Sequence, residues 1–414
     1  MDVKALKEKL KSRQIYLWGA RQLGFSIWQT LDREGFSVAA FLDSSPDLQG
    51  STILGRPVLS PQDVLSRSRG DFFIIITSGF FYEEISEICR AAGLVAGEDF
   101  LTAAELQKLD YQIDVAGSCN LKCISCPRGN FSPQPPAGFM SPETFDRVLD
   151  KIIREDPFVG AVALYNFGEP LLNRELPEII RLAHDRRVQT TISSNLNFKL
   201  DFTEVIKARP TWFRVSVSGY GPGYEITHTG GRWDLFQQNL VKLKDLQAEH
   251  DPGLNVEVFY HIYKDRREEY LRLKELCDSL GFTLRVRHAA LAPLDIVRDY
   301  ARGREISPEA RRTIELQRLP IGRAIEQAQA QKDQPCPYRR CQWITWDLRV
   351  RNCMEWFGPG LELTEKNFLE TTVDEIIEAR RTSAHCRDCM ADGLHRCYLV
   401  YGDESLLEPE RDLR

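Results

Sequence analysis

The strongest constraint on the fold is an alternation of short apolar runs with amphipathic helical patterns. Because parallel strands need a long crossover between them, usually a helix, this alternation predicts a parallel α/β architecture. The longer series has six apolar or alternating runs, at residues 111–116, 160–167, 189–195, 213–219, 255–262 and 283–289. Six strands are too few for a complete eight-stranded barrel, so we expect an open, partial (β/α)6 barrel over residues 109–300.

Two helical patterns in this series have recognisable ends. One begins with Ser141 as the expected N-cap and Pro142 at the first helical position. The other ends at Gly281, where a left-handed C-terminal cap is expected.

Residues 1–108 show a shorter alternation, with apolar runs at 15–19, 36–43 and 71–79. Strand, glycine turn, helix, strand and acidic residue is the order of a nucleotide-binding Rossmann unit, and Asp43 lies 24 residues after Gly19. However, Arg21 replaces the middle glycine that lets a pyrophosphate approach. We therefore predict a Rossmann-like domain that either binds a nucleotide or nucleotide-sugar, or serves as a scaffold or docking domain.

Composition bounds the function classes. The chain has 414 residues, 43% hydrophobic and 28% charged, with a formal net charge of −6, which is typical of a soluble globular protein. Its basic residues are scattered, so no nucleic-acid footprint is evident. The N-terminus is charged and amphipathic, and no window approaches the roughly 18 apolar residues of a membrane span. We expect a cytoplasmic protein that binds neither nucleic acid nor membrane.

The chain has 11 cysteines, and nine of them fall into two clusters, at residues 119–126 and 336–397. A reducing compartment disfavours structural disulfides, so the clustered cysteines are better explained as metal ligands. Cys89 and Cys277 stand alone in helical patterns, and we expect them to be ordinary buried cysteines.

The first cluster places Cys119, Cys123 and Cys126 on the loop that follows the first strand of the longer series. The carboxyl ends of parallel strands are where such folds carry out chemistry. Iron–sulfur clusters are held by cysteine thiolates, normally four. Three ligands leave one iron with an open position, whereas a structural zinc site would be closed by a fourth ligand. The absent fourth cysteine therefore favours an iron–sulfur cluster with a reactive corner.

The Cys-x3-Cys-x2-Cys loop, followed by "NFGEPLL" at the end of the second strand, resembles the radical S-adenosylmethionine (radical SAM) family. The resemblance implies a 4Fe-4S cluster whose open iron binds S-adenosylmethionine and reduces it to a 5′-deoxyadenosyl radical. Gly168, Glu169 and Pro170 match the family's GGEP motif, which implies contacts to the methionyl ammonium. Ser125 replaces a common aromatic residue, and Phe167 replaces the first glycine of that motif.

Polar residues also end the third and fourth strands. These are Ser193, Ser194, Asn195, Ser216 and Ser218. On the resemblance, their side chains reach the ribose hydroxyls and the methionyl carboxylate, although each short polar end taken alone is more often a turn or helix cap.

The second cysteine group resembles the SPASM/twitch extension of radical SAM enzymes, which carries auxiliary iron–sulfur clusters. The shorter twitch pattern implies a 4Fe-4S cluster held by Cys336, Cys353, Cys386 and Cys389, in a domain over residues 331–414 behind a helical linker at 301–330. Cys341 is an alternative to Cys336, and the pattern gives no role to Cys397. Leu348 stands where the hairpin turn usually has glycine. The other interpretation is a structural zinc site with Cys386, Cys389 and either His385 or His395.

The resemblance implies a radical SAM enzyme that abstracts hydrogen from a small polar metabolite, sugar-derived or nucleotide-linked, giving oxidation or epimerisation. Its partners are this substrate and a low-potential electron donor such as flavodoxin or ferredoxin. A radical SAM peptide maturase and a non-catalytic zinc or iron–sulfur scaffold stay open as alternatives. The sequence identifies no general base or hydrogen donor; four residues on late strands have an even chance of facing the barrel interior, namely Tyr260, His261, Arg287 and His288.

Overall fold

The computed structural model describes residues 2–10, 12–78, 81–358 and 360–402. The chain forms two compact units. The N-terminal unit comprises Met1–Asp110, Val148–Val162 and Ala183–Gln189. The barrel unit comprises Tyr111–Arg147, Ala163–Leu182 and Thr190–Arg414. The last predicted domain covers residues 331–414, and its final part, residues 403–414, lies outside the described residues.

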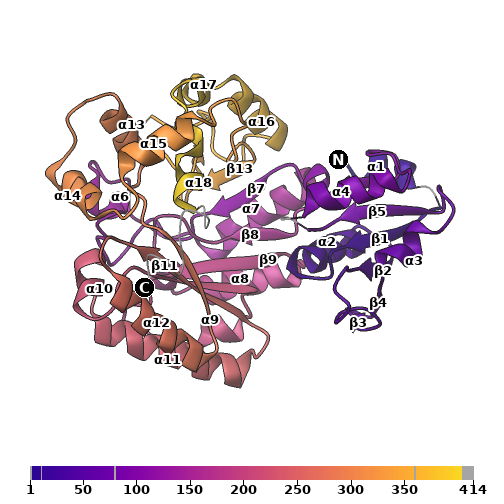
Figure 1. Ribbon diagram of the computed structural model, residues 1–414, viewed down its shortest axis with the longest axis horizontal. Helices are drawn as coiled ribbons and strands as arrows, with labels where there is room; N and C mark the ends of the chain where they lie inside the picture. Colours follow the sequence, from indigo (N-terminus) through magenta and orange to yellow (C-terminus); the bar gives the residue numbers. More distant parts are fainter. Residues whose placement is uncertain (1, 11, 79–80, 359, 403–414) are drawn as a thin grey trace. The chain divides into compact units, whose positions relative to one another are not determined.

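The N-terminal unit contains a six-stranded sheet with the order β3-β4-β2-β1-β5-β6 (Figure 1). Its strands are β1 (Gln14–Trp18), β2 (Val38–Leu42), β3 (Thr52–Ile53), β4 (Arg56–Leu59), β5 (Phe72–Ile76) and β6 (Phe100–Thr102). β1 pairs in parallel with β2 and β5, β4 extends the sheet in parallel beside β2, and β6 does so beside β5. The sheet is therefore of the parallel α/β kind that the alternating sequence predicts.

Helices cover both faces of this sheet. They are α1 (Val3–Leu10), α2 (Gln22–Arg33), α3 (Pro61–Leu65), α4 (Tyr82–Ala91) and α5 (Ala103–Leu106). Alternate strand residues point to opposite faces, so Ile15 and Leu17 pack with α1 and α2, whereas Tyr16 and Trp18 pack with α3 and α4. Cys89 is fully buried in the second layer, as predicted.

Two features of this sheet were not predicted from the sequence. β3 and β4 form a short antiparallel hairpin, and its turn has a positive φ at both Leu54 and Gly55. Asn or Gly normally occupies such positions, so leucine hides the turn signal. β6 has only three residues, too few for a periodic pattern to stand out.

A segment from the middle of the chain completes one core of the N-terminal unit. Phe158 is fully buried in the cluster formed by α1, α2, β1 and β2, with its ring centroid 6.2 Å from that of Phe36. The Arg33 guanidinium donates to the backbone carbonyls of Val159, Pro157 and Arg186. Because buried carbonyls need partners, these bonds fix residues 157–159 and 186 within this unit.

The barrel unit is built on an eight-stranded sheet with the order β12-β11-β10-β9-β8-β7-β13-β14. Its strands are β7 (Asp110–Ile113), β8 (Ala161–Ala163), β9 (Gln189–Ser194), β10 (Trp212–Val217), β11 (Asn255–Ile262), β12 (Thr283–His288), β13 (Cys341–Ile344) and β14 (Val350–Arg351). β9 to β12 pair in parallel, and β13 and β14 form an antiparallel hairpin beside β7. All six predicted strands are present, in an open rather than closed arrangement.

Helices and 3-10 turns connect these strands or follow the last of them. They are α6 (Pro127–Asn130), α7 (Pro142–Glu155), η1 (Pro170–Leu172), α8 (Leu176–Asp185), α9 (Thr203–Lys207), α10 (Pro222–Thr227), α11 (Trp233–His250), α12 (Arg267–Leu280), α13 (Leu294–Ala301), α14 (Pro308–Leu316), α15 (Ile321–Gln329), α16 (Val373–Thr382), α17 (Ala384–Ala391), η2 (Leu394–Arg396) and α18 (Cys397–Gly402). Ser141 Oγ accepts from the Thr144 amide, 3.2 Å away, at the start of α7. Gly281 ends α12 with a φ of 68°. Both predicted helix ends are confirmed.

Burial along the strands distinguishes the two faces of the barrel sheet. In β9 and β10 half-buried residues alternate strictly with fully buried ones, and β11 continues the pattern after its exposed first residue. The fully buried set faces the helices, because Tyr260 on β11 packs 5.9 Å from Tyr270 on α12. The half-buried set lines the concave face, here called the lumen face, which remains accessible to solvent.

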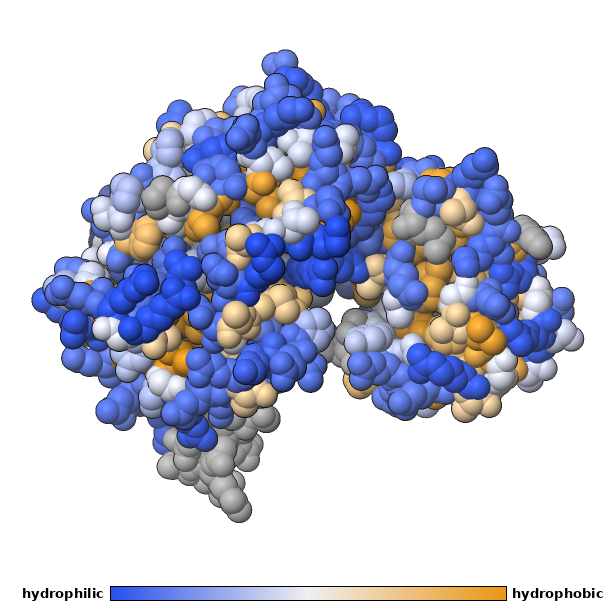
Figure 2. Space-filling view, turned by 90° about the horizontal axis from the view of Figure 1, so that it is seen from above, coloured by the Kyte–Doolittle hydropathy of each residue, from blue (hydrophilic) through white to orange (hydrophobic). Residues whose placement is uncertain are grey.

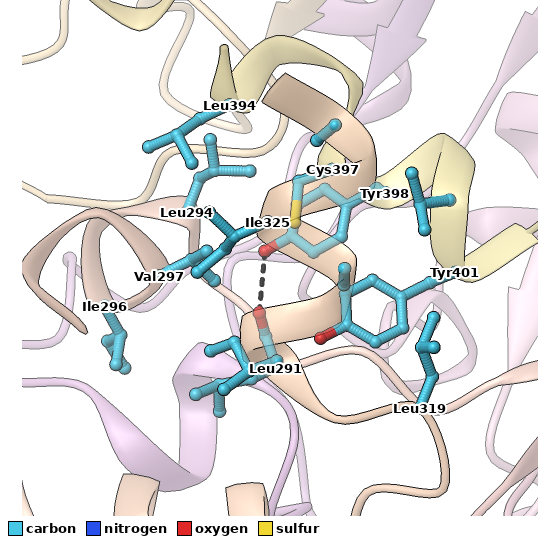
Figure 3. Close-up of a cluster of buried hydrophobic side chains, with 14 of the residues drawn as sticks. Leu291, Leu294, Ile296, Val297, Leu319, Ile325, Leu394, Cys397, Tyr398 and Tyr401 are labelled. Atoms are coloured by element: carbon cyan, nitrogen blue, oxygen red, sulfur yellow. Dashed lines mark hydrogen bonds between the residues drawn. The ribbon is translucent and has the colours of Figure 1, made fainter. Parts of the chain in front are cut away.

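The predicted helical linker shares a hydrophobic core with the end of the chain (Figure 3). Leu294, Val297 and Ile325, from α13 and α15, pack against Leu394 and Tyr398. The Tyr398 hydroxyl donates to the Leu291 carbonyl at 2.9 Å. These helices are thus part of the structure that holds the C-terminal cysteines.

Figure 2 shows hydrophilic residues over most of the face that it presents, with hydrophobic residues in small separate groups. Among the described residues, none of the helices has the length and apolar character needed to span a membrane.

Candidate functional site

The loop after β7 carries Cys119, Cys123 and Cys126, and all three side chains are half-buried. Two backbone hydrogen bonds tie this loop to the end of α10 and the residues just after it: the Lys122 amide donates to the Thr229 carbonyl, and the Ile124 amide donates to the Thr227 carbonyl. The loop is therefore fixed at the carboxyl edge of the sheet, as predicted.

The three thiols face an electrostatic environment that disfavours the free thiolate. Burial, followed by the nearby Glu169 carboxylate, raises the pKa of Cys119 to about 12. Burial raises the pKa of Cys126 to about 11. The pKa of Cys123 is also raised, first by burial and then by the charges of the two neighbouring cysteines. Without a metal these groups are protonated at neutral pH, so binding of a cationic iron group releases protons.

The donor set fits an iron–sulfur group. Three sulfurs come from a single loop, and Asn195 Nδ2 lies 3.7 Å from Cys119 Sγ, close enough for an amide-to-sulfur hydrogen bond. Such second-shell donors orient metal ligands. Among the described residues, no group of three or more His, Cys, Asp or Glu side chains has the arrangement of a metal-ion site.

Glu169 is buried beside this loop, in the turn that follows β8. Its Oε1 accepts from the Leu171 amide at 3.1 Å, and its Oε2 accepts from the Asn195 amide at 2.8 Å. Burial raises the pKa of Glu169 to about 7, and these hydrogen bonds oppose the rise. A buried carboxylate held by two strand ends is poised to pair with a cation.

Gly168 precedes this glutamate and has no room for a side chain. A Cβ atom there would lie 1.6 Å from the Ala116 carbonyl oxygen. The glycine therefore lets the GEP turn approach the backbone that leads into the cysteine loop, where the Glu169 amide donates to the Ser118 carbonyl at 2.8 Å.

The other predicted cofactor-binding residues lie on two neighbouring strand ends. Ser193 Oγ and Ser216 Oγ are 3.2 Å apart on the lumen face. Ser218 Oγ lies 3.4 Å from His261 Nδ1. By contrast, Ser194 Oγ accepts from the Leu196 amide on the buried side of β9.

The four late-strand candidates are divided by strand register. Tyr260 is fully buried against α12, and His288 is 3% exposed. His261 and its β12 partner Arg287 occupy lumen-face positions. Burial, followed by the charge of Arg287, lowers the pKa of His261 to about 3. Of the four, His261 and Arg287 are therefore the pair placed to meet a substrate.

Sequence reasoning missed a guanidinium on the same face. Arg214 on β10 lies over the Phe259 ring, 4.4 Å from its centroid, and donates to the Tyr165 hydroxyl at 2.8 Å. The period-two pattern of "FRVSVSG" placed Arg214 on the same side as Ser216, so the alternation contained the signal.

A cavity of about 150 Å³ lies among the C-terminal cysteines. Cys336, Cys353, Cys386 and Cys389 all line it, although they come from a loop, the end of the hairpin and α17. Cys386 and Cys389 are three residues apart on α17 and so share one helix face. The structure thus brings together the four cysteines of the predicted auxiliary set.

Neither of the two cysteines left open by the sequence lines the cavity. Cys341 begins β13 and is not among the residues that line the cavity. Cys397 is fully buried in the hydrophobic core of Figure 3, and burial, followed by the Glu355 charge, raises its pKa to about 12. Cys397 therefore behaves as an apolar core residue.

Both histidines of the zinc alternative also line the cavity. His395 Nε2 lies 2.9 Å from the Gln334 carbonyl oxygen. The His385 ring packs edge-on against Trp356, with centroids 4.3 Å apart. His385 Nε2 and His395 Nδ1 have no hydrogen-bond partner among the described residues, so the zinc alternative stays open.

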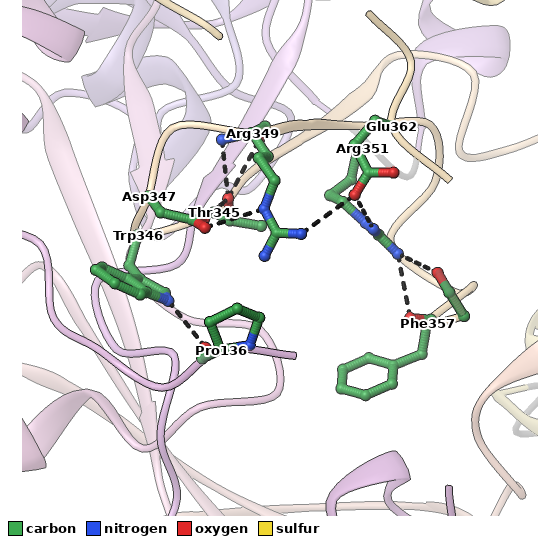
Figure 4. Close-up of polar contacts among 9 residues, drawn as sticks. Pro136, Thr345, Trp346, Asp347, Arg349, Arg351, Phe357 and Glu362 are labelled. Carbon is green, nitrogen blue, oxygen red and sulfur yellow. Dashed lines mark hydrogen bonds and ion pairs between the residues drawn. The ribbon is translucent and has the colours of Figure 1, made fainter. Parts of the chain in front are cut away.

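Trp346, in the turn of the β13–β14 hairpin, contacts the cysteine loop and the segment that follows it (Figure 4). A Cβ atom on Gly117 or on Gly138 would lie 2.2 Å from the indole, so the ring packs directly against both glycines. Trp346 Nε1 donates to the Pro136 carbonyl at 3.2 Å. Leu348, in the hairpin turn, has a φ of 68°, the conformation for which glycine is usual.

In the N-terminal unit, the candidate ribose-binding acid contacts its own backbone. Asp43 Oδ2 accepts from the Ala20 amide at 3.0 Å, and Oδ1 accepts from the Ser45 amide at 2.9 Å. A Cβ atom on Gly19 would lie 2.9 Å from the Thr77 carbonyl oxygen. These residues fix the turn after β1, which favours the scaffold interpretation of the domain.

Comparisons with known proteins agree with this geometry. Residues 113–276 match the family model described as the Radical SAM superfamily. No curated protein matches the sequence significantly.

Several solved structures are similar to parts of the chain. SuiB of Streptococcus suis, bound to the precursor peptide SuiA, is 15% identical, with 70% of this chain and 71% of that chain covered and a TM-score of 0.47. BtrN in complex with AdoMet and 2-DOIA is 16% identical, with 71% and 92% covered and a TM-score of 0.41. Native anSMEcpe with bound AdoMet is 14% identical, with 70% and 88% covered and a TM-score of 0.45.

At these identities and TM-scores the similarities to solved structures carry no functional conclusion. The family match covers the cysteine loop after β7, the GEP turn and the polar ends of β9 and β10. On that match, residues 113–276 form a radical SAM domain.

Proposed function

We propose that Cys119, Cys123 and Cys126 hold a 4Fe-4S cluster whose fourth iron is open to S-adenosylmethionine. The observation that carries the proposal is the placement of three half-buried thiols on one loop of a radical SAM domain, beside the buried Glu169. When bound, the cluster and S-adenosylmethionine supply a 5′-deoxyadenosyl radical that removes a hydrogen atom from the substrate.

The surrounding residues orient the nucleoside. Glu169 accepts from the methionyl ammonium, in a turn kept narrow by Gly168 and begun by Pro170. The cation restores the ionised form of this carboxylate, since an adjacent positive charge lowers a pKa that burial has raised. The ribose hydroxyls and the methionyl carboxylate are held by the polar ends of β9 and β10, namely Ser193, Asn195, Ser216 and Ser218, whereas the predicted Ser194 lies on the buried side of β9 and is left out of this set.

The substrate is a small polar metabolite, sugar-derived or nucleotide-linked, that undergoes oxidation or epimerisation. The lumen face supports this class because its half-buried residues are polar or charged near the carboxyl ends of the strands, among them Arg214, Ser216 and His261. A guanidinium, a hydroxyl and an imidazole suit hydroxyl, carboxylate or phosphate groups better than an apolar ligand. A low-potential flavodoxin or ferredoxin supplies the electron.

A second 4Fe-4S cluster is held by Cys336, Cys353, Cys386 and Cys389. Support comes from the cavity of about 150 Å³ that all four side chains line. One water needs only about 10–15 Å³ of such a cavity, so the space accepts a group much larger than a single water. Thiolates at this site provide a full set of four ligands, in contrast to the three in the first loop.

Anaerobic reconstitution tests the reaction class. After reduction with dithionite and addition of S-adenosylmethionine, the protein is expected to form 5′-deoxyadenosine, measured by chromatography. Cys123→Ala should abolish this product, whereas Cys277→Ala, a substitution of a buried cysteine on α12, should retain it. A wild-type protein that is loaded with iron but forms no 5′-deoxyadenosine would contradict the proposal.

Iron and sulfide analysis tests the second cluster. Two 4Fe-4S clusters give about eight irons per chain, and Cys386→Ala is expected to reduce the count to about four. Cys397→Ala provides the matched control, because that sulfur lies in the hydrophobic core. Equal iron in wild type and Cys386→Ala, or zinc in place of iron, would remove the auxiliary cluster from the proposal.

A further inference from the structure

A buried arginine lies beside the cysteines of the auxiliary cavity. Arg380, in the last turn of α16, is 5% exposed and lines the cavity. Its Nη1 donates to the Arg339 carbonyl at 3.1 Å, and its Nη2 donates to Gln342 Oε1 at 2.5 Å. Its Nε is buried and has no hydrogen-bond partner among the described residues. One donor of a residue that lines the cavity is thus left unused by the protein.

Arg380 differs from the other arginines that line this cavity. Arg339, Arg381 and Arg387 are exposed, so solvent screens their charges. Arg381 is also paired with Glu378 at 2.7 Å. Within the described part of the chain no carboxylate pairs with Arg380. The charge of Arg380 therefore acts on the cavity in a low-dielectric environment and without a local counter-ion.

The electrostatic neighbours of Arg380 are the cysteines themselves. Burial lowers the pKa of Arg380, and the four opposing contributions come from Cys353, Cys386, Cys341 and Cys336, in that order. Three of these belong to the proposed ligand set. A cation placed here compensates thiolate charge that the interior would otherwise disfavour.

We propose that Arg380 raises the reduction potential of the auxiliary cluster, through its buried charge and a hydrogen bond from Nε, so that the cluster can accept an electron. The inference rests on the proposed auxiliary cluster. A cluster gains negative charge on reduction, so a nearby buried cation stabilises the reduced form more than the oxidised form. Net charge and hydrogen bonds to the sulfurs are among the factors that set iron–sulfur potentials.

A purely structural role is the competing explanation. Arg380 joins α16 to residues 339 and 342 through two hydrogen bonds, and this alone would explain its burial. A structural role predicts lower stability on substitution but no change in potential of the protein that still folds. The potential is therefore the measurement that separates the two roles.

The experiment uses the full-length chain with Cys119→Ala, Cys123→Ala and Cys126→Ala, so that only the auxiliary site can hold a cluster. Redox titration is followed by electron paramagnetic resonance. Arg380→Gln is expected to lower the reduced-to-oxidised ratio at least tenfold at a fixed potential, a shift of about 59 mV for one electron. Arg381→Gln changes an exposed neighbour, and its reduced-to-oxidised ratio should stay within about twofold of that of the parent protein. Arg380→Lys keeps the positive charge and should restore most of the ratio that Arg380→Gln loses.

The outcomes separate failure of this inference from failure of the proposed site. A triple variant that binds no iron would remove the auxiliary cluster itself. A loaded Arg380→Gln protein with an unchanged midpoint would overturn the role of Arg380. If Arg380→Gln fails to load, Gln342→Glu decides, because it keeps the bond to Arg380 and opposes its charge. A loaded Gln342→Glu protein must then show the same lowering of the ratio, and an unchanged ratio overturns the inference.

Discussion

Gly168 occupies a position where backbone proximity, rather than backbone conformation, excludes every other residue. Its φ is not in the left-handed region, but a Cβ atom would lie 1.6 Å from the Ala116 carbonyl oxygen. Only the hydrogen atom of a glycine fits beside the Ala116 carbonyl. Because Glu169 follows in the same turn, this close approach fixes the position of the Glu169 carboxylate.

Gly168→Ala is expected to displace the GEP turn and reduce 5′-deoxyadenosine formation at least tenfold, with iron binding to the auxiliary site retained. The matched control is Gly322→Ala on α15, where a Cβ atom meets nothing within 4 Å. Alanine is the better helix former, so the control should be neutral or slightly stabilising. Equal 5′-deoxyadenosine formation by the two variants would show that the GEP turn can shift without loss of activity.

Asp114 is a carboxyl group whose buried environment disfavours its ionised form. It is 3% exposed, and its Oδ1 has no hydrogen-bond partner among the described residues. Burial is the main cause of a pKa raised to about 7, with Arg128 opposing it. The folded state therefore binds more protons than the unfolded state between about pH 4 and pH 7, and the stability contributed by this group falls as pH rises through that window.

Asp114→Asn is therefore expected to stabilise the protein more at pH 8 than at pH 5, by about 2 kcal/mol in the difference. Denaturant unfolding at the two pH values measures it. The exposed Asp245→Asn serves as the control. A gain that is the same at both pH values would mean that Asp114 is already ionised throughout.

At the scale of elements, the β13–β14 hairpin connects the auxiliary cysteines to the radical SAM loop. Trp346 packs on Gly117 and Gly138, while Arg349 and Arg351 both contact Glu362 within the same region (Figure 4). The family resemblance implied a hairpin with its turn at Leu348. It did not predict that one indole at the turn would rest on two glycines more than 200 residues earlier.

Trp346→Phe is expected to cost about 1 kcal/mol of unfolding free energy, the value of the lost bond to Pro136. Trp346→Ala should cost about 2 kcal/mol or more, because the ring packing is lost as well. Denaturant unfolding gives both values, and hydrogen exchange of residues 117–138 should rise only in the alanine variant. An alanine variant as stable as the phenylalanine variant would mean that the indole packing contributes nothing.

At the scale of the whole molecule, the N-terminal unit is not a continuous stretch of chain. Phe158, from the segment between α7 and β8, is buried in its core, and Arg33 binds the carbonyls of that segment. A boundary near residue 108, the sequence-based prediction, would separate residues that share one core.

A fragment of residues 109–414 is therefore expected to aggregate, since Phe158 loses its cluster and becomes exposed. Size-exclusion chromatography measures the soluble monomer fraction. Phe158→Ser in the fragment should increase that fraction, whereas the same change in the full chain should destabilise it by about 3 kcal/mol. A fragment that is monomeric without the substitution would show that the segment folds without this core.

Local spacing was enough for the sequence to determine the six strands of the barrel, the cysteine loop at the end of the first strand, and the GEP turn, because each of these features involves residues near one another in the chain. Only the tertiary structure decided which C-terminal cysteines meet. Cys353 and Cys386 are separated by 32 residues and converge on one cavity, while Cys397, only eight residues after Cys389, enters the hydrophobic core. Long-range packing also decided that His261 faces the lumen and Tyr260 the helices, since strand alternation fixes the period but not the phase.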